Sequence, residues 1–213
     1  MPRAPFITST EFPYHIYNRT EDRNIYDLPS DTLWRLYTEN LSILSWMFHI
    51  KIHAFVLMGN HYHLIASAPS QNLPEAIRYL QSQVSRHVRK ICQTQRFRFG
   101  QRYKWKLVLG HKHYLDLLRY VYQNPVRAKI VDRCESYQWS SLHGLYGKTR
   151  LDFPVSPSFF PDHSNPENPN EFLEWVNNHL DDETLKKVRG MFRKVRGESK
   201  KETGTLLAEE GLG

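Results

Sequence analysis

The chain has 213 residues, of which 40% are hydrophobic, 13% aromatic and 24% charged. This composition excludes a chain that is disordered throughout and supplies enough apolar side chains for one core. Two cysteines exclude a disulfide framework, and the chain has neither a run of 18 apolar residues nor a signal-peptide pattern, so we expect a soluble cytoplasmic protein without membrane spans.

The net charge of +7 is unevenly distributed along the chain. Residues 1–150 hold 21 Lys/Arg against 10 Asp/Glu, residues 151–185 hold 8 acidic and no basic residues, and residues 186–213 hold 8 basic and 4 acidic residues. Between Ala76 and Leu115 there are ten basic residues, no acidic one and six interleaved Phe, Tyr and Trp. Cations and aromatic rings suit single-stranded nucleic acid, because phosphates need neutralising charge and unpaired bases stack. A solvated basic face over an aromatic core is the alternative interpretation.

The first part of the chain predicts two strands around a helix, followed by a hairpin. Residues 14–19 form the first strand, and helical spacing of apolar residues predicts a helix from Ser30, its N-cap, to about Phe48. Residues 50–58 are rich in β-branched and aromatic side chains, which favours a strand. Gly59 and Asn60 suit a type II′ turn, so the segment from His61 is predicted to return as an antiparallel strand.

The middle of the chain predicts a second helix, a strand and a third helix. Asn72 and Glu75 resemble a capping box, which begins a helix that runs to about Cys92. The alternation over residues 97–109 predicts a strand, and a helix follows from about His111 to Asn124, ended by Pro125. Residues 134–147 predict a loop and a short helix. This order predicts an α+β domain with a mainly antiparallel sheet.

The composition changes after Lys148. Residues 151–170 are rich in Pro, Ser and Asn, which is typical of a poorly ordered linker. Helical patterns follow at about 170–180 and 182–195, before a tail that we expect to be frayed. We therefore divide the chain into a domain over 1–148 and an extension over 149–213 that contains an acidic linker, short helices and a flexible tail.

Two histidine pairs have the spacing His-x-His, and only one of them is well placed to bind a metal. His111 and His113 begin a predicted helix, where residues two apart do not share a face. His61 and His63 lie on a predicted strand, where residues two apart point the same way and can hold one divalent ion. The alternative is a pair of half-buried histidines that bond to backbone or water.

The helix from His111 has two opposed faces. At 100° per residue, Leu115, Leu118 and Tyr122 fall on the apolar face that the helix would bury, and the opposite face is polar. That polar stripe consists of His113, Asp116, Tyr120 and Asn124. Tyr120 and Asn124 are one turn apart, so a phenol and an amide oxygen could reach the same metal-bound phosphate. The alternative is a solvated face without chemistry.

Several motifs in order resemble a known family. They are residues 14–19 (YHIYNR), 54–65 (AFVLMGNHYHLI), 120–131 (YVYQNPVRAKIV) and 137–141 (YQWSS). They resemble the HUH single-tyrosine transposases of the REP-associated type (RAYTs) over about residues 12–147. Members usually have Pro and Val where this chain has Gly59 and Tyr62, and neither change affects a ligand. The resemblance implies a ferredoxin-like or RRM-like HUH domain with a central antiparallel sheet.

The resemblance also implies roles for individual residues. Tyr120 would be the nucleophile, and His61, His63 and Asn124 would hold the metal. We expect Mg²⁺ or Mn²⁺, because the substrate itself brings oxygen ligands, although imidazole also suits Zn²⁺. Four basic residues could contact backbone phosphate: Arg102, Lys104, Arg119 and Arg127.

The implied activity is metal-dependent cleavage and rejoining of single-stranded DNA next to REP-like hairpins, through a 5′-phosphotyrosine intermediate. The first alternative is a domesticated, catalytically silent binder of structured single-stranded nucleic acid. The second is a metal-dependent hydrolase of small phosphoesters. The sequence leaves open whether the protein is a monomer or a homodimer. It also leaves open whether the acidic segment 151–185 competes with DNA for the basic surface or completes the core.

Overall fold

The computed structural model describes residues 6–21, 26, 28–94, 97, 99–146, 150–156 and 169–191. Its centre is a four-stranded sheet with the strand order β2-β3-β1-β4, in which all neighbours are antiparallel. The elements that build it are β1 (Tyr14–Arg19), α1 (Ser30–Phe48), β2 (Lys51–Leu57), β3 (His61–Ser67), α2 (Leu73–Ile91) and β4 (Lys104–Leu107). This order and topology are ferredoxin-like, which confirms the predicted fold class. No described helix has the length and apolarity that a membrane span needs.

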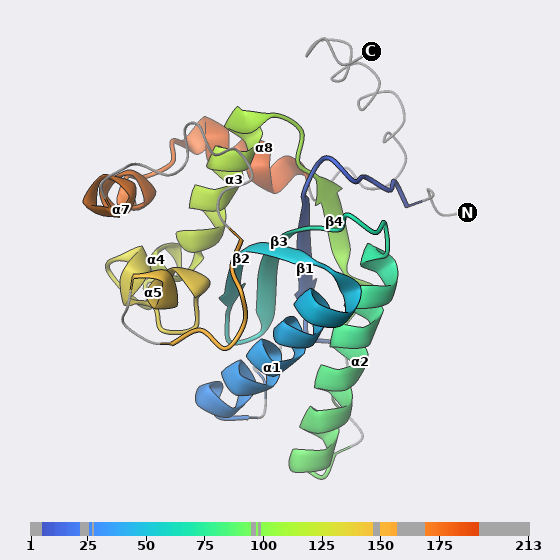
Figure 1. Cartoon of the computed structure of the whole chain (residues 1–213). Coiled ribbons are helices and arrows are strands. Elements are labelled where there is room, and N and C mark those ends of the chain that lie inside the picture. The colour runs from blue at the N-terminus through green and yellow to red at the C-terminus, as the bar shows by residue number, and fades with distance from the viewer. Residues whose placement is uncertain are drawn as a thin grey trace.

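Helices α1 and α2 pack side by side on one face of the sheet (Figure 1). Alternate strand residues point into this layer, among them Ile16, Phe55 and Tyr62. Tyr62 is fully buried, its ring lies 5.5 Å from that of Tyr37, and its hydroxyl accepts a hydrogen bond from Gln81 at 3.0 Å. The tyrosine that replaces the usual valine of the family therefore fits within the aromatic layer.

The opposite face carries helix α3 (His111–Tyr122) and the shorter elements that follow it (Figure 1). These are α4 (Asn124–Arg127), the 3-10 helix η2 (Cys134–Ser136), α5 (Ser141–Leu145), α7 (Pro169–Asn177) and α8 (Asp182–Met191). A second apolar cluster joins α3 to Ala54, Val56 and Ile65 of the sheet. The sheet thus separates two cores, and α3 belongs to the second.

Helices α7 and α8 are part of this second core. Val176 and Val188 are buried in the same cluster as Leu118 and Val121 of α3. The described part of the C-terminal segment therefore completes a core, which was one of the two alternatives left open by the sequence. Residues 157–168 of the predicted linker and the predicted tail beyond residue 191 lie outside the described residues.

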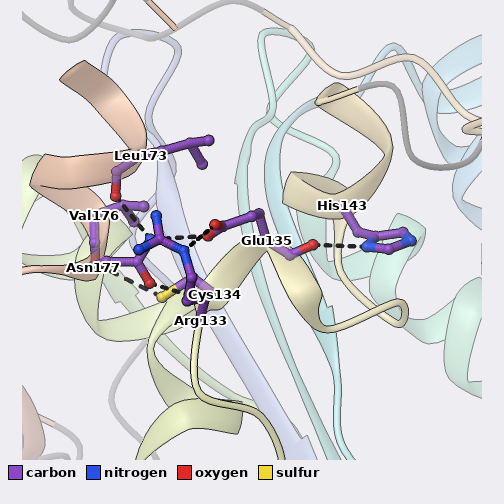
Figure 2. A network of polar contacts seen from close by, with 7 residues as sticks. All are labelled: Arg133, Cys134, Glu135, His143, Leu173, Val176 and Asn177. Atoms are coloured by element: carbon purple, nitrogen blue, oxygen red, sulfur yellow. Dashed lines mark hydrogen bonds and ion pairs between the residues drawn. The ribbon is translucent and has the colours of Figure 1, made fainter. Parts of the chain in front are cut away.

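A polar network fixes α7 to the loop after α4 (Figure 2). The amide of Asn177 accepts from the Cys134 backbone N–H at 2.9 Å and donates to the buried Glu135 carboxylate at 2.8 Å. Arg133 pairs with the same carboxylate, and the ring of His143 donates to the Glu135 carbonyl at 2.7 Å. Desolvation acts to raise the pKa of the Glu135 carboxylate, but the hydrogen bonds from Arg133 and Asn177 and the Arg133 charge together lower it.

Three details of the strands and turns differ from the sequence prediction. The predicted strand over 97–109 is paired with β1 only from Lys104 to Leu107, because the chain bends away after Gly100; Phe99 makes a single bridge to Thr20. The turn at Gly59 is not type II′, because Gly59 has no positive φ. The carbonyls of Gly59 and Asn60 instead accept hydrogen bonds from Tyr26 and Thr20, which hold the turn.

The helix ends also differ in detail. Ser30 is the first residue of α1, and Pro29 takes the N-cap position. Asn72 does precede α2, but its side chain donates to the Phe48 carbonyl at 3.0 Å instead of capping the helix. Helix α3 ends at Tyr122, and Asn124 begins α4 after a one-residue break at Gln123.

Candidate active site

His61 and His63 lie on the face of β3 that is directed toward α3. Their ring centroids are 5.3 Å apart and the ring planes are nearly perpendicular, at 86°. On the neighbouring strand Arg19 stands opposite His61 and Tyr17 opposite His63. The Tyr17 ring contacts both imidazoles, with centroid distances of 5.6 and 4.9 Å. The strand alternation predicted for the histidine pair thus brings the two rings together.

A hydrogen bond orients each imidazole through its Nδ1 atom. Nδ1 of His61 lies 2.7 Å from the Asn60 side-chain oxygen, so this nitrogen carries the proton and Nε2 keeps a lone pair. Nδ1 of His63 lies 2.9 Å from Nε2 of His15, and both residues of this pair are buried. When His63 donates in this bond, its Nε2 also keeps a lone pair. Such second partners fix the tautomer of metal-binding histidines.

Burial keeps these imidazoles neutral. Desolvation lowers the pKa of His61 to about 4, with a further contribution from the nearby Arg19 charge. Desolvation, aided by His113, lowers the pKa of His15 to about 3. The pKa of His63 also lies well below its usual value, first because of burial and then because of the neighbouring His15, His61 and two arginines. Neutral imidazole is the form that coordinates a metal.

Tyr120 of α3 faces this histidine group. Its ring stands perpendicular to that of His63, with the centroids 5.8 Å apart, and lies 6.5 Å from the ring of His15. Tyr120 is only partly buried, whereas Tyr122 is 2% exposed and its hydroxyl bonds to Ser141 at 3.1 Å. Of the two tyrosines in this motif, the structure therefore brings Tyr120 to the histidines and places Tyr122 in the core.

Asn124 and Arg127 contact the backbone of Tyr120. The amide nitrogen of Asn124 donates to the carbonyls of Tyr120 and Val121 at 2.9 and 3.2 Å. Since both partners are carbonyl acceptors, the atom that faces them must be the amide nitrogen. The amide oxygen, Oδ1, makes neither of these two hydrogen bonds. Arg127 donates to the Tyr120 carbonyl at 2.7 Å and stacks over its ring, with Cζ 4.3 Å from the centroid.

The donor set suits a divalent cation that is completed by other ligands. The described residues contain no group of three or more His, Cys, Asp or Glu that could hold a metal. The expected ligands, two imidazole nitrogens and the Asn124 oxygen, could leave positions for water and phosphate oxygen. Cys134 is buried, with its thiol directed at the Val176 carbonyl, and so does not add the sulfur ligand that zinc favours.

The four basic residues predicted to contact DNA have different surroundings. Arg102 and Lys104 are exposed beside and on β4. Arg119 donates to the carbonyls of Asn178 and His179 and lies 5.4 Å from the Trp175 ring, so the protein itself engages its guanidinium. Arg127 is the one of the four that contacts Tyr120 in the described part of the chain.

Three residues of this group were not predicted from the sequence: His15, Tyr17 and Arg19. All three belong to the first strand, at alternate positions that share the face of His61 and His63. The signal was present in residues 14–19, because His15, Tyr17 and Arg19 occupy alternate positions and therefore one face of the strand. It could be used only once β1 was known to pair with β3, which the sequence did not indicate.

Comparison with known proteins agrees with this geometry. Residues 8–124, more than half of the chain, match the family described as "Transposase IS200 like". The chain belongs to this family of transposases. It is also 31% identical over 101 residues to a Haemophilus influenzae protein described as "Putative REP-associated tyrosine transposase", a match that covers 42% of this chain and 57% of that relative.

A solved structure shares the fold. It is described as a REP-associated tyrosine transposase bound to a REP hairpin, and it superimposes with a TM-score of 0.58 over 75% of this chain and 95% of that one, at 16% identity. The resemblance to REP-associated tyrosine transposases that the motifs indicated is thereby confirmed.

Proposed function

We propose that this protein cleaves and rejoins single-stranded DNA beside hairpins of the REP type, with Tyr120 as the nucleophile. Membership of a transposase family rests on the match of residues 8–124 to the family model. The hairpin comes from the described ligand of the solved structure and from the description of the relative. The proposal adds the strand chemistry, the metal and the roles of individual residues.

One observation carries the proposal: a partly exposed phenol stands against two adjacent neutral imidazoles. The Tyr120 ring is 5.8 Å from that of His63, and His61 lies beside His63 on the same face of β3. Packing in an aromatic layer accounts for a tyrosine such as Tyr62 on the face that α1 and α2 cover. It does not explain a phenol that remains accessible next to imidazoles whose Nε2 atoms are available to a ligand.

The proposed reaction is an in-line displacement at phosphorus. The Tyr120 oxygen loses its proton and forms a bond to phosphorus, while the bond from phosphorus to the preceding 3′ oxygen breaks. That oxygen takes up a proton and leaves as a 3′ hydroxyl, so the product is a 5′-phosphotyrosine. The new ester replaces one phosphodiester by another, and a second 3′ hydroxyl can therefore reverse the step and join strands without ATP.

His61, His63 and Asn124 would hold Mg²⁺ or Mn²⁺. When bound, such a cation polarises the phosphate oxygens and orients the phosphorus for attack. The residues of this chain do the rest: Asn60 and His15 orient the imidazoles, and Arg127 holds the backbone and ring of Tyr120. Asn124 has both amide hydrogens directed at helix carbonyls, which presents its oxygen outward.

The test uses a labelled single strand that carries a hairpin, incubated with the full chain and Mg²⁺ or Mn²⁺. We expect a covalent protein–DNA adduct that survives denaturation. Tyr120→Phe should abolish the adduct, and a chelator should do the same. Tyr122→Phe is the matched control, since it removes the same atom two residues away and loses only the bond to Ser141.

Each outcome separates the candidate functions. The absence of an adduct with either metal would reject strand transfer and leave binding without cleavage. Turnover of the strand or of a small phosphoester that survives Tyr120→Phe would favour a metal-dependent hydrolase. An adduct that is lost in Tyr122→Phe and kept in Tyr120→Phe would show that the nucleophile has been assigned to the wrong tyrosine.

A further inference from the structure

Two arginines flank the histidine pair without an acidic partner. Arg19 is the cross-strand neighbour of His61, and Arg127 stacks on Tyr120. No ion pair among the described residues includes either arginine. Partly buried guanidinium groups are normally paired with a carboxylate, so two unpaired ones at one site require a physical explanation.

Each of these side chains also has a buried donor without a hydrogen-bond partner. The atoms are Nε of Arg19 and Nη1 of Arg127. A buried donor left without a partner is unfavourable, and more so when it belongs to a charged group. The rest of each side chain is fixed, because Arg19 lies 5.7 Å from the Tyr17 ring and Arg127 donates to the Tyr120 carbonyl. Both donors are thus held in place without an acceptor.

The charges of the two arginines act on the same site. Arg19 stands opposite His61 on the neighbouring strand, and Arg127 lies over the Tyr120 ring, whose centroid is 5.8 Å from that of His63. A guanidinium stays protonated even when it is partly desolvated. The site is therefore positive before any metal binds, and both arginines remain accessible because they are only partly buried. An anion with several acceptor oxygens would neutralise these charges and could bond to the accessible N–H groups of both guanidinium groups.

We propose that Arg19 and Arg127 are a pair of phosphate-binding residues, which hold two backbone phosphates of a single strand on either side of the histidine and tyrosine group. The planar guanidinium matches phosphate oxygens with two parallel hydrogen bonds. This inference rests on the proposed function, and it adds the residues that bind the strand around the reacting phosphate. Arg119, which has a similar unpartnered Nε, is excluded because carbonyls of the chain occupy its guanidinium.

Binding can be measured separately from cleavage. The probe is a fluorescent single-stranded oligonucleotide, and its anisotropy is titrated with full-length Tyr120→Phe protein in EDTA at several salt concentrations. For single strands, each neutralised phosphate contributes about 0.7 to the slope of log K against log salt. We expect Arg19→Gln and Arg127→Gln to reduce that slope by about 0.7 each. The Lys variants at both positions should keep the slope, because they keep the charge.

Arg35→Gln is the matched control, since it removes one exposed charge from α1, on the opposite side of the sheet and outside the basic stretch between Ala76 and Leu115. Its slope should stay at the wild-type value. The proposal is overturned if the two Gln variants keep the wild-type slope, or if Arg35→Gln lowers it equally. Thermal unfolding and the Lys variants show whether a change reflects misfolding. Because the assay contains no metal and no nucleophile, a failure of adduct formation in the parent protein leaves this result interpretable.

Discussion

The two faces of the sheet are built from the same strands and differ in almost every physical property. On one face Phe55 and Tyr62 pack with the rings of Trp34 and Tyr37, and the Tyr62 hydroxyl accepts a hydrogen bond from Gln81. On the other face alternate residues of β1 and β3 bring together imidazoles and a guanidinium with an unpartnered donor. Both layers contribute apolar packing, and the second also holds desolvated imidazoles beside Tyr120.

The two faces differ in the free energy of burying their side chains. Aromatic rings on the α1 and α2 side gain free energy from area and from edge contacts. The histidine side includes groups whose charged forms are disfavoured by burial, such as His15 and His63. A stable layer on one side of a strand can therefore support an unfavourable arrangement on the other side, since both are attached to the same backbone.

The largest expected effect is a loss of stability on the aromatic face. Phe55→Ala removes a fully buried ring that contacts Trp34, Tyr37 and Tyr62, so we expect the free energy of unfolding to fall by about 3–5 kcal/mol. Urea denaturation measures it. Tyr17→Ala, on the histidine face, should cost less than half as much because Tyr17 is only partly buried. Equal losses would remove the proposed distinction between the faces.

A second, smaller effect is a pH dependence that comes from the histidine face. The pKa of His15 is about 3 in the folded chain against an ordinary 6.5, so below pH 6.5 the unfolded chain binds a proton that the folded chain does not. The free energy of unfolding therefore decreases as the pH falls from 6.5 toward 3, by about 1.4 kcal/mol per pH unit. In His15→Gln the free energy of unfolding should change less steeply with pH, by this same amount per pH unit.

The control for this pH effect is His87→Gln, since His87 is exposed on α2. Denaturation at pH 6.5, 5.5 and 4.5 gives the three slopes. Parallel curves for wild type and His15→Gln would mean that His15 takes up its proton in the folded protein as readily as in the unfolded chain. Protonation of His61, His63 and His113 shifts all the curves in the same direction, because burial lowers their pKa values too.

The smallest effect concerns the helices that cover the histidine side. Asn177→Ala removes the hydrogen bonds to the Glu135 carboxylate and the Cys134 backbone, so we expect a loss of about 1–2 kcal/mol in the free energy of unfolding. Asn178→Ala should change it by less than about 0.5 kcal/mol, because Asn178 is exposed and contributes only its carbonyl. Equal values for the two variants would contradict the role given to the Asn177 side chain.

Local periodicity in the sequence was enough to predict much of this molecule. The strands and helices from Tyr14 to Ile91 were predicted within a few residues, because apolar spacing there agrees with the burial each element achieves. Helical phase also separated Tyr120 from Tyr122, since one face of α3 is wholly apolar and the other is not. Strand alternation placed His61 and His63 on one face for the same reason.

The remaining features depend on contacts between distant segments. Arg19 and His15 became part of the site only through the register of β1 against β3. The break after Tyr122 accompanies hydrogen bonds of the buried Gln123 side chain to the carbonyls of Val176 and Asn178, which no pattern near residue 123 reveals. The strand predicted over 97–109 was too long. The alternation of its side chains reflects packing on the first core, whereas pairing with β1 covers only Lys104 to Leu107.

The two residues that tie α3 to the end of α7 have a consequence for how the chain is made. Arg119 and Gln123 lie on either side of Tyr120, and their carbonyl partners at 176–179 come more than fifty residues later. During translation the amino-terminal part of a chain leaves the ribosome first. The sheet, its imidazoles and the packing of α3 against Ala54 and Val56 can thus form on a nascent polypeptide, while the hydrogen bonds of Arg119 and Gln123 form only after synthesis has passed residue 179.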